Sequence, residues 1–121
     1  MTHIYKGIVE KGGGRATALG FPTVNIPLAD VSVSGIYAAC VLLRGRAYGA
    51  AAYADLRRKV LEAHLLDFGG DLVGEEIVIE LKEKIRDDAR FADDAALAAA
   101  IKDDTERVRE YCALHPCSPV S

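Results

Sequence analysis

The residues best suited to chemistry gather in one stretch near the N-terminus, GGGRATALGFPTVN, which runs from Gly12 to Asn25. Glycines such as Gly14 allow backbone N–H groups to approach phosphate oxygens closely, and Arg15 adds a forked cationic donor. The first half of the stretch therefore suits the phosphates of a nucleotide. The alternative is a plain turn, because neither a Walker loop nor a Rossmann fingerprint is present.

The second half of the stretch offers oxygen ligands for a metal ion. Pro22 sets an extended exit for the backbone, and Thr23 and Asn25 lie two residues apart, so their side chains share one face of a strand. A hydroxyl and an amide oxygen side by side are hard ligands that suit Mg²⁺. The alternative is that both side chains only satisfy a turn through hydrogen bonds.

Glu62 is the second unusual feature, because it lies in the apolar segment KVLEAHLLDF. A carboxylate in such a strand is costly unless it is paired, protonated or placed at the mouth of a barrel. It is a candidate general base, and a solvated rim residue is the alternative. His64, two residues later, is either its partner or a core histidine whose hydrogen bonds are satisfied.

Six short apolar segments must position these residues. They are expected as strands within residues 3–9, 23–28, 35–45, 46–54, 59–68 and 75–85, with a hairpin turn around Gly45. The last segment alternates with a period of two, which places on one face Ile77, Ile79, Leu81 and Ile85. Strands at this spacing predict a small antiparallel barrel.

A helical segment follows the strands. Asp93 is a candidate N-cap, and Pro116 ends the segment. Between them a helical stripe is formed by Leu97, Ile101, Thr105, Val108 and Cys112. We therefore expect a C-terminal α-helix that packs on the outside of the barrel.

Composition excludes several classes of function. The chain has 121 residues and a net charge of −3, and half of its residues are hydrophobic, which indicates one globular domain without nucleic acid or membrane as a partner. No apolar run could span a bilayer, and the N-terminus does not read as a signal peptide. Cys40, Cys112 and Cys117 lack metal-ligand spacing, so we expect reduced thiols and a cytoplasmic location.

Taken together, these residues resemble the riboflavin kinase (flavokinase) family, which in bacteria is usually the C-terminal half of a bifunctional FAD synthetase. The similar segments are KGGGRATALGFPTVNI, SGIYAACV, LEAHLLDFGGDLVGEEIVIELKEKIRDDARF and ALAAAIKDD, in the family's order. The resemblance implies a mainly β fold, a six-stranded antiparallel Greek-key barrel with a C-terminal α-helix. It also implies transfer of the ATP γ-phosphate to the 5′-hydroxyl of riboflavin, which gives FMN and ADP.

The resemblance also implies roles for individual residues and the extent of the domain. Nucleotide binding falls on Gly12, Gly14, Arg15 and Thr23, the Mg²⁺ ligands are Thr23 and Asn25, the catalytic residue is Glu62, and the flavin-binding residues are Arg86 and Phe91. A single riboflavin-kinase-like domain would cover residues 1–113, with the barrel at about 1–91, the helix at about 93–113 and a tail at 114–121.

The chain departs from the family's pattern in three ways. An Asn-x-Gly and an Arg-Pro-Thr-like run usually precede the glutamate strand, but the shorter stretch YGAAAYADLRRKVLEAH lacks both, and Val73 replaces a common tyrosine. No adenylyltransferase domain precedes the barrel, so we expect a separate adenylyltransferase or partner subunit. Three interpretations stay open: a riboflavin kinase, a non-catalytic or weakly active relative that binds flavin or nucleotide, and a barrel without a ligand.

Overall fold

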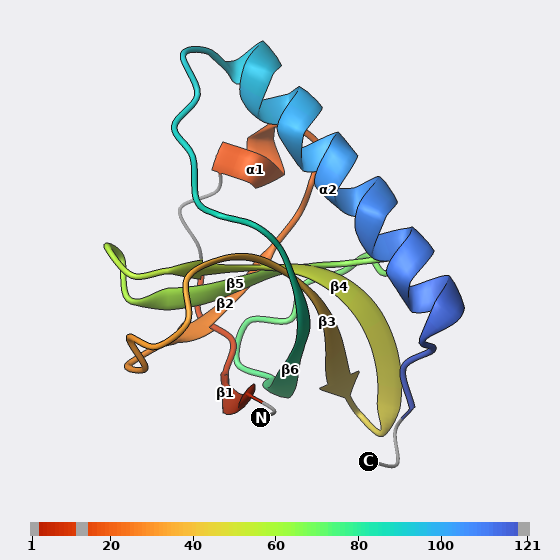
Figure 1. Cartoon of the computed structure of the whole chain (residues 1–121). Helices are drawn as coiled ribbons and strands as arrows, with labels where there is room; N and C mark the ends of the chain where they lie inside the picture. The colour runs from red at the N-terminus through yellow and green to blue at the C-terminus, as the bar shows by residue number, and fades with distance from the viewer. Residues whose placement is uncertain (1–2, 12–14, 119–121) are drawn as a thin grey trace.

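The computed structural model describes residues 3–11 and 15–118, and within them the chain forms one curled antiparallel sheet with helices outside it (Figure 1). The elements in chain order are β1 (His3–Ile8), α1 (Arg15–Ala18), β2 (Val24–Pro27), β3 (Gly35–Leu43), β4 (Arg46–Asp55), β5 (Val60–Leu65), β6 (Glu76–Arg86) and α2 (Asp94–Leu114). The strand order across the sheet is β1-β6-β3-β4-β5-β2.

The two edge strands approach each other and nearly close the sheet. The Glu10 N–H, just after β1, donates to the Asn25 carbonyl oxygen of β2 at 2.8 Å. Closure removes most of the unpaired backbone groups that an open sheet would expose at its edges. The expected fold, a six-stranded antiparallel barrel with a C-terminal helix, is confirmed.

Alternation along the strands creates the interior of the barrel. In β5, for example, Leu61, Ala63 and Leu65 are buried while the residues between them are half-buried on the outer face. The largest fully buried side chains of the main core are Ile26, Leu61, Ile77, Ile79, Val33 and Val41. The outer face is therefore left to polar residues and to whatever the helices cover.

The hairpin between β3 and β4 turns where the sequence predicts it. Leu43 pairs with Arg46, and the two residues between them, Arg44 and Gly45, have φ angles of 51° and 78°. Left-handed φ angles at both central positions are typical of the tight two-residue hairpin turn, whose twist matches that of the two flanking strands. The turn brings β3 and β4 into a long continuous ladder.

One detail of the β6 prediction is wrong. Ile77, Ile79 and Leu81 are buried in the barrel, but Ile85 packs outside, in a second cluster with Val108 of α2. The register between β3 and β6 shifts at the Ala38/Ala39 step and again at the Ile36/Tyr37 step, which indicates β-bulges. A bulge adds one residue to one strand, so the side chains beyond it change faces.

Helix α2 crosses the outer surface of the barrel (Figure 1). It begins after Asp93, whose carboxylate accepts a hydrogen bond from the Ala96 N–H at 2.8 Å. Its closest apolar contact is made by Val108, which is fully buried against Ala38 and Leu66. No helix within the described ranges is long and apolar enough to cross a membrane.

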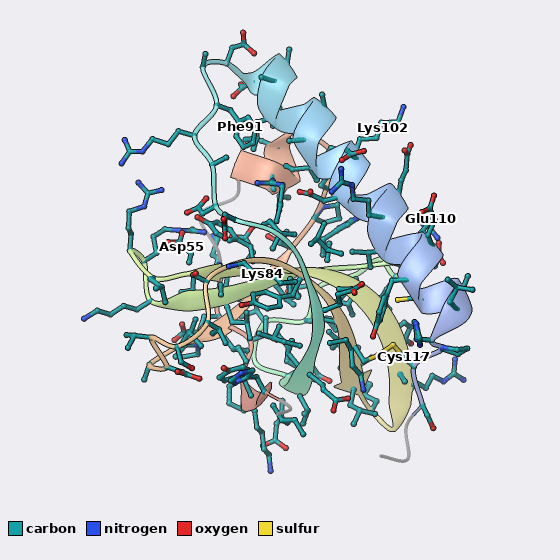
Figure 2. The ribbon with its side chains drawn as sticks, in the orientation of Figure 1. Asp55, Lys84, Phe91, Lys102, Glu110 and Cys117 are labelled. Carbon is teal, nitrogen blue, oxygen red and sulfur yellow. A yellow bond between two sulfur atoms is a disulfide. The ribbon has the colours of Figure 1, made fainter. Side chains whose placement is uncertain are left out.

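The expectation of three reduced thiols is wrong for two of them. Cys40 of β3 and Cys117, just beyond α2, form a disulfide, which Figure 2 shows at the end of the helix. The pairing depends on where the chain runs after α2, because Cys117 lies 77 residues after Cys40, and no local spacing in the sequence reports it. Cys112 stays a free thiol, and burial raises its pKa.

Candidate active site

A cavity of about 600 Å³ lies on the outer face of the sheet, beneath α1 and the N-terminal half of α2. Its floor is formed by β3, β4 and β5, and its walls come from the segment around Phe21, the loop after β6 and the first turns of α2. The floor residues are Ile36, Ala51, Ala52, Tyr53, Asp55, Glu62 and His64, and the wall residues include Ala16, Phe21, Thr23, Phe91, Leu97, Ile101 and Asp104. The interior of the barrel is packed, and this outer hollow has room for a ligand.

Strand register explains why residues far apart in sequence meet here. Arg86 of β6 pairs with Ile36 of β3, which pairs with Tyr53 of β4, then Glu62 of β5 and Asn25 of β2. Directly paired residues of antiparallel strands share one face of the sheet. These five residues therefore form one row across the outer face, which we call the cross-strand row.

Glu62 lies at the cavity in an ion pair. Its side chain is 15% exposed, and its Oε2 accepts from an Arg58 terminal nitrogen at 2.6 Å. The Arg58 Nε donates to Asp55 Oδ2 at 2.7 Å. A carboxylate in this apolar strand is costly unless it is paired, protonated or at a barrel mouth, and the structure shows Glu62 paired, on the barrel wall.

Thr23 and Asn25 take up different positions. Thr23 lines the cavity, and its backbone N–H donates to Thr17 Oγ1 at 3.3 Å. Asn25 is buried, and its Oδ1 has no hydrogen-bond partner among the described residues. A buried acceptor oxygen without a donor is uncommon in proteins, and a hard cation or a donating ligand would satisfy it.

Thr23 and Asn25 offer oxygen ligands that a magnesium ion can use without a cluster of acidic side chains. Within residues 3–11 and 15–118, no group of three or more His, Cys, Asp and Glu side chains could hold a metal. Mg²⁺ commonly uses few protein ligands and keeps water and substrate phosphates for the rest. A hydroxyl and an unpartnered amide oxygen near a cavity match that ligand set.

The predicted nucleotide loop lies only partly within the described residues. Gly12 and Gly14 lie outside the described residues. Arg15 begins α1, and the next residue, Ala16, lines the cavity. The described part of the loop therefore ends at the cavity.

Arg86 and Phe91 both line the cavity, and each contacts the other. The Arg86 guanidinium lies 5.6 Å from the centre of the Phe91 ring, and Figure 2 shows Phe91 in the loop between β6 and α2. Two Arg86 nitrogens donate to the two Asp104 carboxylate oxygens, each at 2.8 Å. The hydrogen bond to Asp104 raises the pKa of Arg86 further. Arg86 therefore joins β6 to α2, in addition to facing the cavity.

His64 belongs to the wall of the cavity rather than to Glu62. Its Nδ1 donates to the Pro22 carbonyl oxygen at 2.8 Å, and its ring meets Phe21 edge-on at 5.8 Å. The sequence left open whether His64 is a partner of Glu62 or a histidine whose hydrogen bonds are satisfied, and the structure shows the second. It holds the segment that carries Thr23 against β5.

Sequence reasoning missed Tyr53, Arg58 and Asp104. The Tyr53 hydroxyl donates to Asp88 Oδ2 at 2.7 Å, and burial, followed by this hydrogen bond, raises the pKa of Tyr53 to about 12. Tyr53 is thus a neutral donor that ties β4 to the loop after β6. For Arg58 a local signal exists, because it lies three residues after Asp55 and four before Glu62.

The fold defines a class of small antiparallel barrels with a C-terminal helix, here with a cavity on the outer wall, and comparison with known proteins gives the family. The riboflavin kinase (Flavokinase) family model matches residues 1–112. The chain belongs to the riboflavin kinase family. It is 39% identical over 117 residues to the bifunctional riboflavin kinase/FMN adenylyltransferase of Escherichia coli (strain K12), a match that covers 89% of this chain and 37% of that protein.

Solved structures agree on the fold. A riboflavin kinase from Trypanosoma brucei superposes with a TM-score of 0.66 at 26% identity, over 93% of this chain and 80% of that one. A macrolide-efflux protein from Streptococcus pneumoniae superposes with a TM-score of 0.76 at 27% identity, over 88% of this chain and 38% of that one. The chain thus spans little more than a third of the curated bifunctional relatives it matches.

Proposed function

We propose that this chain is a riboflavin kinase, which transfers the γ-phosphate of ATP to the 5′-hydroxyl of riboflavin and releases FMN and ADP. One observation carries the proposal: Glu62 faces a cavity of about 600 Å³ and lies in register with Asn25, whose buried Oδ1 is unpartnered among the described residues. A candidate base on the cavity wall and a hard oxygen ligand are thus paired across neighbouring strands. Membership of the family supports this choice of reaction.

Glu62 acts as the general base in this proposal. The 5′-hydroxyl oxygen forms a bond to the γ-phosphorus, the bond from that phosphorus to the β–γ bridging oxygen breaks, and ADP leaves with the electron pair. Glu62 accepts the hydroxyl proton and later releases it to solvent. Phosphoryl transfer depends mainly on alignment and on neutralising charge, so few protein groups have to react.

The remaining residues bind and orient the substrates. Gly12, Gly14 and Arg15 contact the phosphates of the nucleotide, and Thr23 with Asn25 would hold Mg²⁺, which neutralises phosphate charge when bound. Phe91 offers its ring to the flavin, and Arg86 keeps that ring in place through the contact at 5.6 Å.

The proposal includes the extent and the setting of the domain. One catalytic domain covers residues 1–113, with 114–121 as a tail, and an adenylyltransferase of the kind named in the bifunctional relatives would use the FMN. The location is cytoplasmic. The Cys40–Cys117 disulfide counts against that location, because disulfides are uncommon in reducing compartments, and it removes the reduced-thiol argument for Cys40 and Cys117.

The test is incubation of the protein with riboflavin and Mg-ATP, with FMN followed by chromatography. We expect FMN to form, and Glu62→Gln to lower kcat by roughly 10²–10⁴-fold, the usual contribution of a positioned acid or base. Glu83→Gln is the matched control, because Glu83 is exposed on β6 and does not line the cavity. Normal turnover by Glu62→Gln would contradict the assignment of the base.

A second candidate is a relative that binds flavin or nucleotide without turnover. It is favoured by the connection between β4 and β5, which is only residues 56–59 and can cover little of a ligand. Equilibrium binding of FMN and Mg-ADP, measured on the same sample as FMN formation, separates the two candidates. Binding without FMN formation would select the second.

A further inference from the structure

The turn between β4 and β5 carries an arginine whose contacts go beyond closing the hairpin. Asp55 pairs with Val60 across the turn, and Asp55 Oδ1 accepts the backbone N–H groups of Arg57 at 3.0 Å and Arg58 at 3.2 Å. A carboxylate that bonds to the backbone two and three residues later stabilises a turn by itself. The Arg58 side chain is therefore available for a different role.

That side chain bridges two carboxylates. Its Nε donates to Asp55 Oδ2 at 2.7 Å and a terminal nitrogen donates to Glu62 Oε2 at 2.6 Å. Both Asp55 oxygens are thus in use, one for the turn and one for Arg58. Charge-assisted bonds of this length are among the strong hydrogen bonds in proteins.

The bridge is anchored at its buried end. The Asp55 side chain is 4% exposed, whereas that of Arg58 is 46% exposed. Burial acts to raise the pKa of Asp55, but the hydrogen bond from Arg58 and the turn N–H groups outweigh it and hold the pKa below its usual value. Asp55 is therefore ionised at neutral pH and fixes a long side chain that would otherwise sample many rotamers.

We propose that Arg58 is a positioning residue for Glu62, an inference that rests on the proposed kinase function. Arg58 holds Glu62 Oε2, and the other oxygen, Oε1, has no hydrogen-bond donor among the described residues. The buried Asp55 holds the Arg58 side chain, and Arg58 in turn holds Glu62. A short turn thereby fixes the base at the cavity wall, in a chain whose β4–β5 connection is too short to cover the site.

A purely structural role for Arg58 makes a different prediction. Loss of a structural contact lowers stability and changes the kinetic constants together or not at all. Loss of a positioning contact leaves riboflavin bound but misplaces the base, so kcat falls while KM for riboflavin changes little. A misplacement near 1 Å can cost roughly 10²-fold in rate.

The experiment measures FMN formation by the full chain and by Arg58→Gln, Arg58→Lys and the control Lys59→Gln. Lys59 lies in the same turn, is exposed and does not line the cavity. We expect kcat of Arg58→Gln to fall by about 10- to 100-fold, with KM for riboflavin within about threefold. Arg58→Lys keeps a cation that reaches one carboxylate, so it should recover part of the loss, and Lys59→Gln should match the parent.

A double variant shows whether Arg58 acts through Glu62. If it does, Arg58→Gln combined with Glu62→Gln loses no more activity than Glu62→Gln alone, because the group to be positioned is already gone. Multiplied losses, or a normal kcat in a folded Arg58 variant, would overturn the positioning role while leaving the kinase intact. If the parent forms no FMN, the proposed function fails, and the role of Arg58 fails with it.

Discussion

The two halves of α2 are attached to the barrel by different chemistry. The N-terminal half borders the cavity, and its buried attachment is the ion pair between Asp104 and Arg86 of β6. The C-terminal half packs Val108 against the outer face of the sheet, and the chain beyond it is linked to β3 by the Cys40–Cys117 disulfide. The buried attachment of the first half is an ion pair and that of the second is apolar and covalent, and an exposed ion pair between Arg109 and Asp67 also joins the second half to the loop after β5.

This difference separates support of the site from support of the fold. Ion pairs respond to pH, and their partners can rearrange when a ligand enters a neighbouring cavity. Apolar contacts and a disulfide neither respond to pH nor rearrange when a ligand enters, but the disulfide responds to reductant. Changes at the cavity half should therefore affect ligand binding and stability together, while changes at the other half should affect stability alone.

The largest expected effect on stability comes from the disulfide. Cys117→Ser opens a loop closed over a separation of 77 residues. In the chain-entropy description, loss of such a cross-link costs about 4 kcal/mol in the free energy of unfolding. Denaturant unfolding of the oxidised protein measures it, and reductant should lower the parent to the level of the variant.

The matched control is Cys112→Ser, because Cys112 is the free thiol on the same end of the molecule. It should respond to reductant as the parent does. A parent whose unfolding is unchanged by reductant would contradict the structural role of the disulfide. Riboflavin binding at low denaturant should be the same in the oxidised and reduced parent, since the disulfide lies away from the cavity.

The next largest effect is expected at Asp104. Asp104→Asn leaves the half-buried Arg86 guanidinium without its carboxylate, and breaking a buried pair in this way costs about 3 kcal/mol. Riboflavin affinity should fall as well, because Arg86 supports Phe91 at the cavity. Unfolding and quenching of flavin fluorescence measure the two effects.

The neighbouring Asp103 provides the control for that variant. Its ion pair with Arg107 is exposed along α2, so Asp103→Asn should change stability little. Equal effects of the two variants would mean that the buried pair does not set the position of the cavity half. Lost stability with unchanged riboflavin affinity would remove the link between this pair and the site.

A smaller effect is expected from Val108→Ala in the other half. Val108 is fully buried, and removing its two methyl groups leaves a small cavity, at a cost of about 2 kcal/mol. FMN formation at temperatures below unfolding should be unchanged. A fall in kcat in the folded variant would show that the two halves of α2 are not independent.

Much of this architecture could be predicted from local patterns. Short apolar segments separated by turn residues identified the strands, and Asp93 identified the start of α2, because both signals depend only on neighbouring residues. The bulge that turns Ile85 outward could not be predicted, since it depends on the pairing of β6 with β3. The Cys40–Cys117 pair depends on the same long-range geometry.

The candidate site shows the same division. Thr23 and Glu62 were predicted as site residues from their residue types, and both line the cavity. Arg58 and Asp104 looked like ordinary charged surface residues, because the ion pairs that they make depend on the conformations of long side chains. Residue types thus predicted where chemistry could occur, while the supporting contacts required the structure.

The smallest expected effect is a pH dependence that arises at the cavity side. The pKa of Asp55 in the folded protein lies below its unfolded value of about 3.9 because its hydrogen bonds from Arg58 and the turn outweigh burial. A lowered pKa contributes stability that is fully present above the unfolded pKa and is lost as the pH falls through the folded pKa. Free energies of unfolding of the parent and Asp55→Asn should therefore differ most at about pH 7, and the difference should shrink as the pH falls below about 4. The penalty of Val108→Ala should stay constant over this range, because no titrating group is changed. A constant penalty for Asp55→Asn as well would show that the Arg58 bridge adds nothing to the stability of the cavity side.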